Sequence, residues 1–261
     1  MRKERECQLL RQMILLLGGK EILSEEKEEL VSIWRGLVNQ RPAGWISPAY
    51  LTCEQEFLTA YHENHRQSLE NCKQTSHPNI LLYYGDICHL QVDAIVNAAN
   101  SDLLGCFIPN HTCIDNAIHF YAGMELRQAC TRLMEEQGHR EAVGQVKVTS
   151  GYALPAQLIF HTVGPQILEG KGLTPIREHL LRQCYLSCLH QAKEEGIRTL
   201  AFCAISTGEF GYPKKEAAQL ATQTVKDWLR ETGYELTVIF TLYTAEDALY
   251  YEQELGVREE R

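Results

Sequence analysis

Residues 97–119 have the sequence NAANSDLLGCFIPNHTCIDNAIH, in which a strand end, a polar loop and a helix start follow one another. Three residues with soft ligand atoms stand close together in this loop: Cys106, His111 and Cys113. Zinc binds thiolate sulfur and imidazole nitrogen in a tetrahedron, and three protein ligands leave the fourth position open, as in catalytic sites. Because the spacing lets one loop wrap one ion, we predict a zinc-bearing ligand pocket here.

The alternative for this cluster is a buried cysteine pair beside a surface histidine. The polar setting of the loop, which includes Pro109 and Asn110, favours the metal. A purely structural zinc needs a fourth protein ligand, which Asp115, His119 or a distant cysteine could supply. If the fourth position is open, the ion could orient a ribose hydroxyl or polarise water.

Amide and carboxylate side chains flank the cluster. Asn97 and Asn100 are separated by two alanines at a strand end, and an amide can both donate to and accept from a ribose hydroxyl. We expect Asn97 to brace the backbone and Asn100 to face the ligand. Asp115 is either a general base that aligns water and ribose or the N-cap of a helix. His119 lies on the same helix face, and we interpret it as a packing residue.

From residue 79 onward, predicted strands alternate with predicted helices. The strands cover 80–84, 94–97, 146–152, 158–163, 199–205 and 236–242, and the helices cover 115–137, 174–196, 213–231 and the chain after 244. This order predicts a three-layer α/β/α domain with a mixed, largely parallel sheet. Ligands of such sheets lie outside the carboxyl ends of the strands. The polar residues that follow apolar strands are Asp86, Asn97, Asn100 and Ser206.

Residues 1–75 differ from the rest because they are charged and helical in pattern. Three helices are predicted, in 7–19, 24–40 and 47–64, and Ser24 before two glutamates predicts the start of the second one. We expect residues 1–75 to form a helical N-terminal extension packed on a main domain of residues 76–261. A role in substrate recognition or as a lid is the alternative.

A glycine-bearing turn joins the strand near residue 200 to the next helix. Its sequence runs Ser206, Thr207, Gly208, Glu209, Phe210, Gly211. Exposed loop amides and the positive end of the following helix favour a diphosphate. Phe210 could stack on a sugar or base, or it could cap the sheet. Asp86 either closes a turn or accepts a hydrogen bond from an exocyclic amine such as that of adenine.

The bulk composition is that of a soluble globular protein, with 44% hydrophobic and 23% charged residues. The sequence contains no apolar run long enough for a membrane span. A net charge of −9 disfavours nonspecific nucleic-acid binding. The ten cysteines are dispersed through apolar stretches, so we expect reduced thiols and a cytoplasmic protein.

Residues 81–242 resemble the macrodomain family, whose members bind ADP-ribose. Four segments in family order carry the resemblance: 85–87, 92–100, 114–123 and 206–213. The resemblance implies that Asp86 binds adenine with the Ile87 amide nearby and that Asn100 contacts the distal ribose. It implies that residues 206–211 cradle the diphosphate, and that an aspartate at position 115 assists removal of ADP-ribose from acidic side chains.

The chain departs from the usual hydrolytic pattern between Asn100 and Asp115. Where relatives carry a run of glycines, only Gly105 remains and the segment 106–113 replaces the others. This resembles the zinc-dependent macrodomain subgroup of pathogenic bacteria and fungi, which often accompanies a sirtuin-type ADP-ribosyltransferase. That subgroup has a helical N-terminal extension, which residues 1–75 match.

We therefore predict a zinc-dependent hydrolase that removes mono-ADP-ribose from proteins, with aspartate or glutamate esters as the linkage. Asn100 and Asp115 are the predicted catalytic residues, and Cys106, His111 and Cys113 are the predicted zinc ligands. The predicted partners are ADP-ribose, a mono-ADP-ribosylated protein and a sirtuin-type transferase system. Two alternatives remain: a non-catalytic reader whose zinc only holds the loop, and an enzyme that deacetylates O-acetyl-ADP-ribose.

Overall fold

The computed structural model of the protein describes residues 1–168 and 170–257, and its centre is a seven-stranded sheet. The strands are β1 Lys73–Gln74, β2 Ile80–Tyr84, β3 Ala94–Ala99, β4 Val146–Ser150, β5 Leu158–Val163, β6 Thr199–Phe202 and β7 Thr237–Leu242. They lie in the order β1-β2-β7-β6-β3-β5-β4. The five inner strands are parallel, and β1 and β4 are antiparallel edge strands. The predicted mixed, largely parallel sheet is confirmed.

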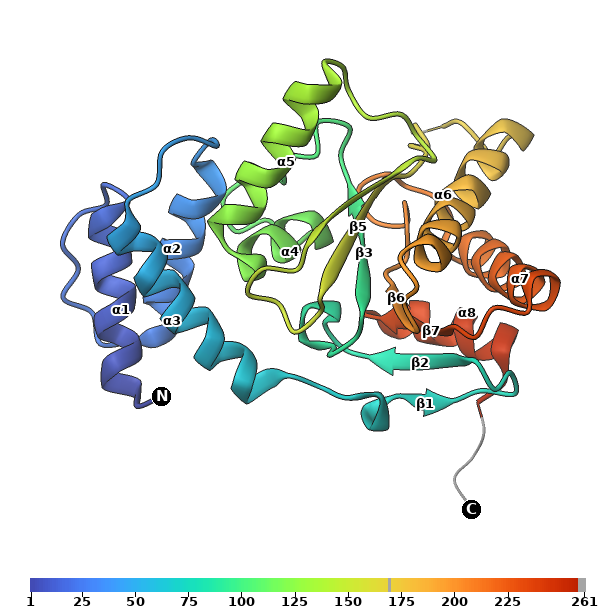
Figure 1. Ribbon diagram of the computed structural model, residues 1–261, viewed down its shortest axis with the longest axis horizontal. Coiled ribbons are helices and arrows are strands. Elements are labelled where there is room, and N and C mark those ends of the chain that lie inside the picture. The colour runs from blue at the N-terminus through green and yellow to red at the C-terminus, as the bar shows by residue number, and fades with distance from the viewer. Residues whose placement is uncertain (169, 258–261) are drawn as a thin grey trace.

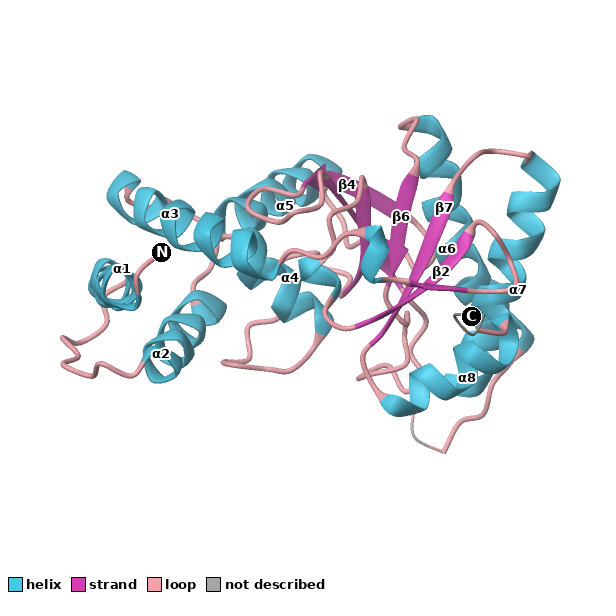
Figure 2. Cartoon of the chain, turned by 90° about the horizontal axis from the view of Figure 1, so that it is seen from below, coloured by secondary structure: helices cyan, strands magenta, loops and turns pink. Residues whose placement is uncertain are grey.

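Helices cover both faces of this sheet (Figure 1). One face carries α4 Ile114–Ala122 and α5 Met124–Gln137. The other carries α6 Pro175–Glu194, α7 Lys214–Thr232 and α8 Ala245–Leu255, as the view from below also shows (Figure 2). The central strands are almost wholly buried, as expected for strands covered on both sides. The three-layer α/β/α prediction is therefore correct.

Two helix starts follow their sequence signals and one does not. Thr174 caps α6 through Arg177 N, and Thr244 forms a capping box with Asp247 at the start of α8. The predicted start at Ser24 is wrong, because the second helix, α2 Lys27–Gln40, begins three residues later without a side-chain cap. The Ser24 hydroxyl accepts from Glu26 N and so closes a turn before the helix.

The predicted helix 115–137 is two helices in the structure. Gly123 separates α4 from α5 with φ of +92°, a conformation that glycine adopts without steric cost. Two strands are also shorter than predicted by two or three residues. Tyr152, with φ of +51°, lies beyond the end of β4, and the Ala204 carbonyl after β6 accepts from Thr207 in a turn instead of a ladder.

The N-terminal region forms a small helical layer beside α4 and α5. Its helices are α1 Lys3–Leu16, α2 and α3 Pro48–His65. They share a buried core with Phe120 and Met124 of the main domain. The Trp34 ring of α2 lies 4.7 Å from the Phe120 ring, and its Nε1 donates to the Tyr50 hydroxyl at 2.9 Å. The predicted helical N-terminal region is thus present and packed on the sheet domain, but it ends before residue 75, because Lys73 and Gln74 already pair with β2 as strand β1.

Two further expectations concern the whole chain. In the part of the chain that the structure describes, no helix has the length and apolarity to cross a membrane. All ten cysteines lie in that part and none is in a disulfide, as expected of reduced thiols.

Candidate functional site

The predicted site residues gather at the carboxyl edge of the parallel strands. Asp86 follows β2, Asn100 follows β3 and Ser206 follows β6, and these strands run in the same direction. Asp86 accepts from Cys88 N at 2.9 Å and thereby caps a short 3₁₀ turn, Ile87–His89. The Ile87 side chain is buried in the core.

A buried amide–carboxylate network lies at the end of β3. Asn97 Nδ2 donates to Asp115 Oδ1 at 2.8 Å and contacts His161 Nδ1 at 3.1 Å. Asn100 Nδ2 donates to Asp115 Oδ2 at 3.1 Å and to the Gly105 carbonyl at 3.0 Å. The expectation that Asn97 braces the backbone is wrong, because both of its partners are side chains. Asn100 and Asp115, by contrast, are in direct contact.

His161 is a member of the network that we did not predict. It pairs with Asn97 across β3 and β5, so the two side chains lie on the same face of the sheet. Because its Nδ1 accepts from Asn97, its Nε2–H faces Thr149 Oγ1 at 2.9 Å. Burial lowers the pKa of His161 to about 4, which keeps the ring neutral. A histidine inside an otherwise apolar strand was the available sequence signal.

His161 also forms a potential ligand group with His119 and Cys130, and all three residues are buried. Both His161 ring nitrogens already have hydrogen-bonding partners, whereas both His119 ring nitrogens lack one in the described structure. His161 therefore belongs to the hydrogen-bonded network behind Asp115, whereas His119 adds no hydrogen bond to it in the described structure.

Asp115 is buried, and its surroundings shift its pKa. Burial raises the pKa of Asp115 to about 6, against the opposing effects of the Asn97 hydrogen bond and the positive charge of Arg127. His119 Nε2 lies 3.6 Å from Asp115 Oδ1, but burial lowers the pKa of His119, so the ring is neutral. The helix-cap alternative for Asp115 is wrong, because the Cys113 thiol caps α4 by accepting from Asn116 N.

Gly105 allows the close approach of the loop to this network. It has φ of +81°, and a Cβ atom there would lie 2.8 Å from the His119 ring. A side chain at this position would push the loop away from Asn100 and His119. The one glycine kept in the segment is therefore required by the packing of the loop on α4.

The three predicted metal ligands converge. One atom of each of Cys106, His111 and Cys113 lies within 4.8 Å of the others, and Cys106 Sγ is 3.5 Å from His111 Nδ1. Two thiols and an imidazole suit zinc. Within residues 1–168 and 170–257 no fourth His, Cys, Asp or Glu joins this cluster. Burial raises the pKa of Cys113 to about 12, so binding must displace its proton.

The glycine-bearing loop lies beside this cluster. Glu209 Oε1 of the loop is 3.6 Å from His111 Nε2, the ring nitrogen that faces away from Cys106. Ser206 has φ of +67°, and its hydroxyl is buried without a protein partner in the described structure. Phe210 packs partly on the core, which supports its capping role. An anion bound by residues 206–211 would thus lie next to the loop of residues 106–113, which we call the metal loop.

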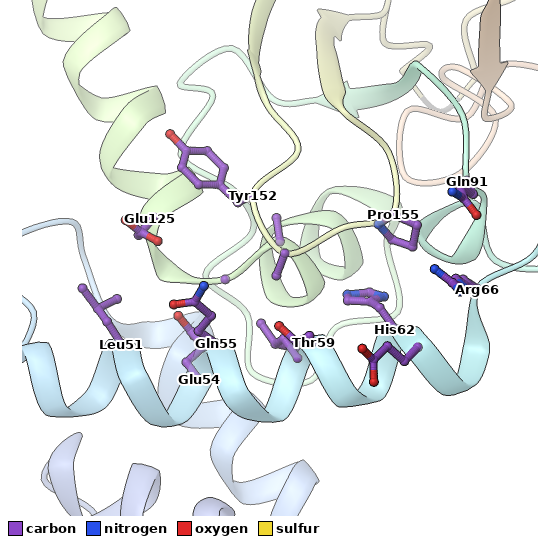
Figure 3. A pocket seen from close by; sticks show the side chains of 15 residues that line it. Leu51, Glu54, Gln55, Thr59, His62, Arg66, Gln91, Glu125, Tyr152 and Pro155 are labelled. Carbon is purple, nitrogen blue, oxygen red and sulfur yellow. The ribbon is translucent and has the colours of Figure 1, made fainter. Parts of the chain in front are cut away.

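A separate groove of about 440 Å³ lies between α3 and the junction of α4 and α5 (Figure 3). Glu54 and His62 of α3, with Arg66 directly after the helix, form one wall, and Tyr152 and Pro155 belong to the other. None of the predicted site residues lines it. The groove is therefore distinct from the site at the carboxyl edge of the sheet.

The fold and the site define an α/β protein with a ligand site at the carboxyl edge of its parallel strands. The profile of the family described as "Macro domain" matches residues 96–221. A relative from Staphylococcus aureus (strain MRSA252), named protein-ADP-ribose hydrolase, is 43% identical over 232 residues, which are 89% of this chain and 87% of that protein. The chain belongs to the macro domain family.

Two other similar proteins extend the comparison. A Fusarium oxysporum protein named "Probable bifunctional ADP-ribose hydrolase/ADP-ribosyltransferase" is 44% identical over 185 residues, covering 68% of this chain and 31% of that protein. The solved structure of a Trypanosoma brucei macrodomain in complex with ADP-ribose aligns with a TM-score of 0.65 and 29% identity, covering 84% of this chain and 94% of that one.

Proposed function

We propose that this protein is a zinc-dependent hydrolase that removes mono-ADP-ribose from aspartate or glutamate esters of modified proteins. The observation that carries the proposal is the contact of Asn100 with both Asp115 and Gly105, at the start of the metal loop. The Staphylococcus aureus relative, which matches over most of both chains, supports the hydrolase activity by its name.

The ligand would lie along the carboxyl edge of the sheet. Asp86 would accept a hydrogen bond from the adenine amine, with the Ile87 main chain beside the ring. The diphosphate would occupy the loop of residues 206–211, where the Ser206 hydroxyl, which has no partner among the described residues, is a donor. The distal ribose would then reach Asn100 and Asp115. The Trypanosoma brucei macrodomain, solved with ADP-ribose, supports this class of ligand.

The reaction needs a positioned water and a proton acceptor. The water oxygen forms a bond to the anomeric carbon, and the bond from that carbon to the ester oxygen breaks with its electron pair going to the acceptor carboxylate. The water proton passes to the Asp115 carboxylate and then to solvent. The pKa of Asp115, raised by burial to about 6, suits a general base near neutral pH. Asn97 and Asn100 hold its two oxygens in place.

Cys106, His111 and Cys113 would hold the zinc ion. When bound, zinc supplies a Lewis acid that can orient a ribose hydroxyl or polarise water. The three side chains are half-buried, so their cluster is accessible from solvent. Gly105 joins this cluster to the carboxylate network, and Asn100 holds the Gly105 carbonyl.

The proposed partner is a sirtuin-type ADP-ribosyltransferase that makes the modification this enzyme removes. The Fusarium oxysporum relative supports the pairing, because its name combines a hydrolase and a transferase in one protein. A modified substrate protein with an acidic acceptor residue completes the proposed system.

The test is release of ADP-ribose from a mono-ADP-ribosylated, glutamate-linked protein, with zinc content measured in parallel. The enzyme is compared as purified, after chelation and after zinc is restored. We expect release to disappear with zinc and to return with it. Cys113→Ala should lose zinc and turnover, and Asp115→Ala should keep zinc and lose on the order of 100-fold or more in turnover.

Other outcomes contradict parts of this proposal. Release that survives complete removal of zinc makes the ion unnecessary for the reaction. Tight ADP-ribose binding without release from any modified protein makes the chain a reader. Turnover of O-acetyl-ADP-ribose without release of ADP-ribose from protein would show that the substrate is a free metabolite.

A further inference from the structure

The metal loop of residues 106–113 rests on helix α2 of the N-terminal region. Three side chains of α2 reach toward this loop: Ser32, Arg35 and Asn39. They lie on one face of the helix, spaced by three and four residues. A helix outside the sheet domain therefore supplies direct contacts to the segment that carries the predicted zinc ligands.

Arg35 makes the central contact. Its Nε and Nη2 atoms donate to Asn116 Oδ1 at 3.0 and 2.8 Å, and Nη2 also donates to the His111 carbonyl at 3.3 Å. The guanidinium carbon lies 5.2 Å from the centre of the Phe120 ring, which packs against the cation. One arginine thus holds both the main chain of a predicted ligand and the side chain of Asn116.

Asn116 contacts the other two predicted ligands. It is fully buried, and its Nδ2 donates to the carbonyls of Cys106 and Ile108 at 3.4 and 3.2 Å. Its main-chain N donates to Cys113 Sγ at 3.4 Å. Because Asn116 Oδ1 accepts from Arg35, the amide orientation is fixed with Nδ2 toward the loop. Arg35 and Asn116 together therefore link all three ligand positions to α2.

A second pair of bonds holds the tip of the loop. Asn110 N donates to Asn39 Oδ1 at 2.9 Å, and Asn110 Nδ2 donates to Ser32 Oγ at 3.3 Å. Asn110 has φ of +55°, so this conformation needs support from its surroundings. Gly36 lies between these contacts, and a Cβ atom there would be 3.5 Å from the Asn110 side chain.

The helix itself is anchored to the sheet domain. Trp34 packs on Phe120 of α4, and Arg127 of α5 donates to the carbonyls of Val38 and Asn39 at 2.9 and 3.3 Å. Arg127 also lies under the Phe107 ring of the loop, 4.6 Å from its centre. The loop is therefore held between α2 and α5, both of which are fixed in place.

We propose that helix α2 is the outer support of the zinc site and that Arg35 is the positioning residue that sets the affinity of the loop for zinc. The inference rests on the proposed function, because it concerns the same metal site. Outer partners that orient metal ligands typically change metal affinity by about 10- to 100-fold when they are removed. Arg35 acts through Asn116 and the His111 carbonyl, without touching the ion.

The experiment measures zinc affinity by competition with a chelator in the full chain. Arg35→Met is compared with Arg5→Met, which removes an arginine that bridges α1 to Glu56 of α3 without contacting the metal loop. We expect Arg35→Met to weaken zinc binding by about 10- to 100-fold and Arg5→Met to leave it unchanged. Arg35→Lys, which cannot donate to Asn116 in the same fork, should fall in between.

Readouts besides activity separate positioning from general stability. Circular dichroism and the Tm of the zinc-free protein show whether Arg35→Met folds, and the d–d absorption of the cobalt-substituted protein reports the ligand geometry. If Arg35→Met does not fold, the conservative Arg35→Lys variant carries the comparison. Equal zinc affinity of the wild type and the folded Arg35 variants overturns the role of Arg35 and leaves the proposed function unaffected. A wild type that binds no zinc overturns the metal site itself.

Discussion

His111 Nε2 lies 3.6 Å from Glu209 Oε1, and this pair joins the metal loop to the glycine-bearing loop. The other ring nitrogen of His111 faces Cys106 Sγ. In proteins, a metal-binding histidine commonly donates its second N–H to a carboxylate, which orients the ring. Glu209 is in that position, although its side chain is 73% exposed and the contact is therefore weakened by solvent.

This contact predicts that zinc and ADP-ribose binding are coupled. Zinc should raise the affinity for ADP-ribose, and by linkage ADP-ribose should raise zinc affinity by the same factor. In Glu209→Gln the factor by which each ligand raises the affinity for the other should move toward one. Zinc affinity itself should fall by less than about tenfold. Calorimetric titration of ADP-ribose into zinc-loaded and zinc-free protein measures this coupling factor. Glu235→Gln, at an exposed glutamate paired with Arg198, is the matched control; an unchanged factor in Glu209→Gln would contradict the coupling.

The network behind Asp115 predicts a combined loss of activity and stability in Asn97→Ala. The substitution removes the donor to Asp115 Oδ1 and leaves a buried carboxylate poorly satisfied, which costs about 1–3 kcal/mol of unfolding free energy. Turnover should fall at least about tenfold, because Asp115 loses one of its two amide partners. Thr149→Val removes the partner on the far side of His161 and should affect stability more than turnover. Wild-type turnover in a folded Asn97→Ala protein would refute this role.

The approach of Gly164 to Ser206 predicts that a single methyl group disturbs the glycine-bearing loop of residues 206–211. A Cβ atom at Gly164 would lie 1.9 Å from Ser206 Oγ and 2.9 Å from Ile205 Cγ2. Overpacking of this kind costs about 1–3 kcal/mol, so Gly164→Ala should weaken ADP-ribose binding roughly tenfold or more. At Gly172 a Cβ atom would have no neighbour within 4 Å among the described residues, so Gly172→Ala should bind like wild type. The prediction does not hold if both variants show the same dissociation constant.

The burial of Glu54 in the groove beside α3 predicts that the free energy of unfolding depends on pH. Burial raises the pKa of Glu54 to about 7, against hydrogen bonds from Met124 N and the Tyr50 hydroxyl. Between pH 4.5, the ordinary pKa of the group, and pH 7, folded Glu54 holds a proton that the unfolded chain has released. The stability that this proton contributes is therefore complete below pH 4.5 and is lost across this window as the pH rises through 7. The shift corresponds to a loss on the order of 3 kcal/mol.

Urea unfolding of wild type and Glu54→Gln at pH 5 and pH 8 (roughly the two ends of that window) measures this term. The difference in unfolding free energy between the two proteins should change across the window, because glutamine cannot ionise. Burial lowers the pKa of the nearby His62 to about 4, which gives a pH dependence of opposite sign that is common to both proteins. Glu56→Gln, at an exposed site, is the control and should show no such change. Parallel pH profiles of wild type and Glu54→Gln would show that Glu54 is ionised in the fold.

Six of the seven strands in the described structure and most of its helices could be predicted from local patterns alone, whereas the two-residue strand β1 was missed. The apolar runs of β2, β3 and β7 and the capping box at Thr244 are encoded within a few neighbouring residues. The convergence of Cys106, His111 and Cys113 was also predictable, because one short loop carries all three. The break at Gly123 was missed because both flanking segments have strong helical periodicity, and the glycine alone did not decide between a tolerated residue and a chain break.

The sequence by itself determined the α/β order of elements, the carboxyl-edge location of the polar motifs and the clustering of Cys106, His111 and Cys113 in one loop. Only the tertiary structure decided which distant residues complete the site: His161 beside Asn97, Glu209 beside His111 and Arg35 on Asn116. The physical reason is that periodicity and capping act between neighbours along the chain. Partners from different strands and helices are selected by sheet order, register and helix packing, which no local pattern specifies.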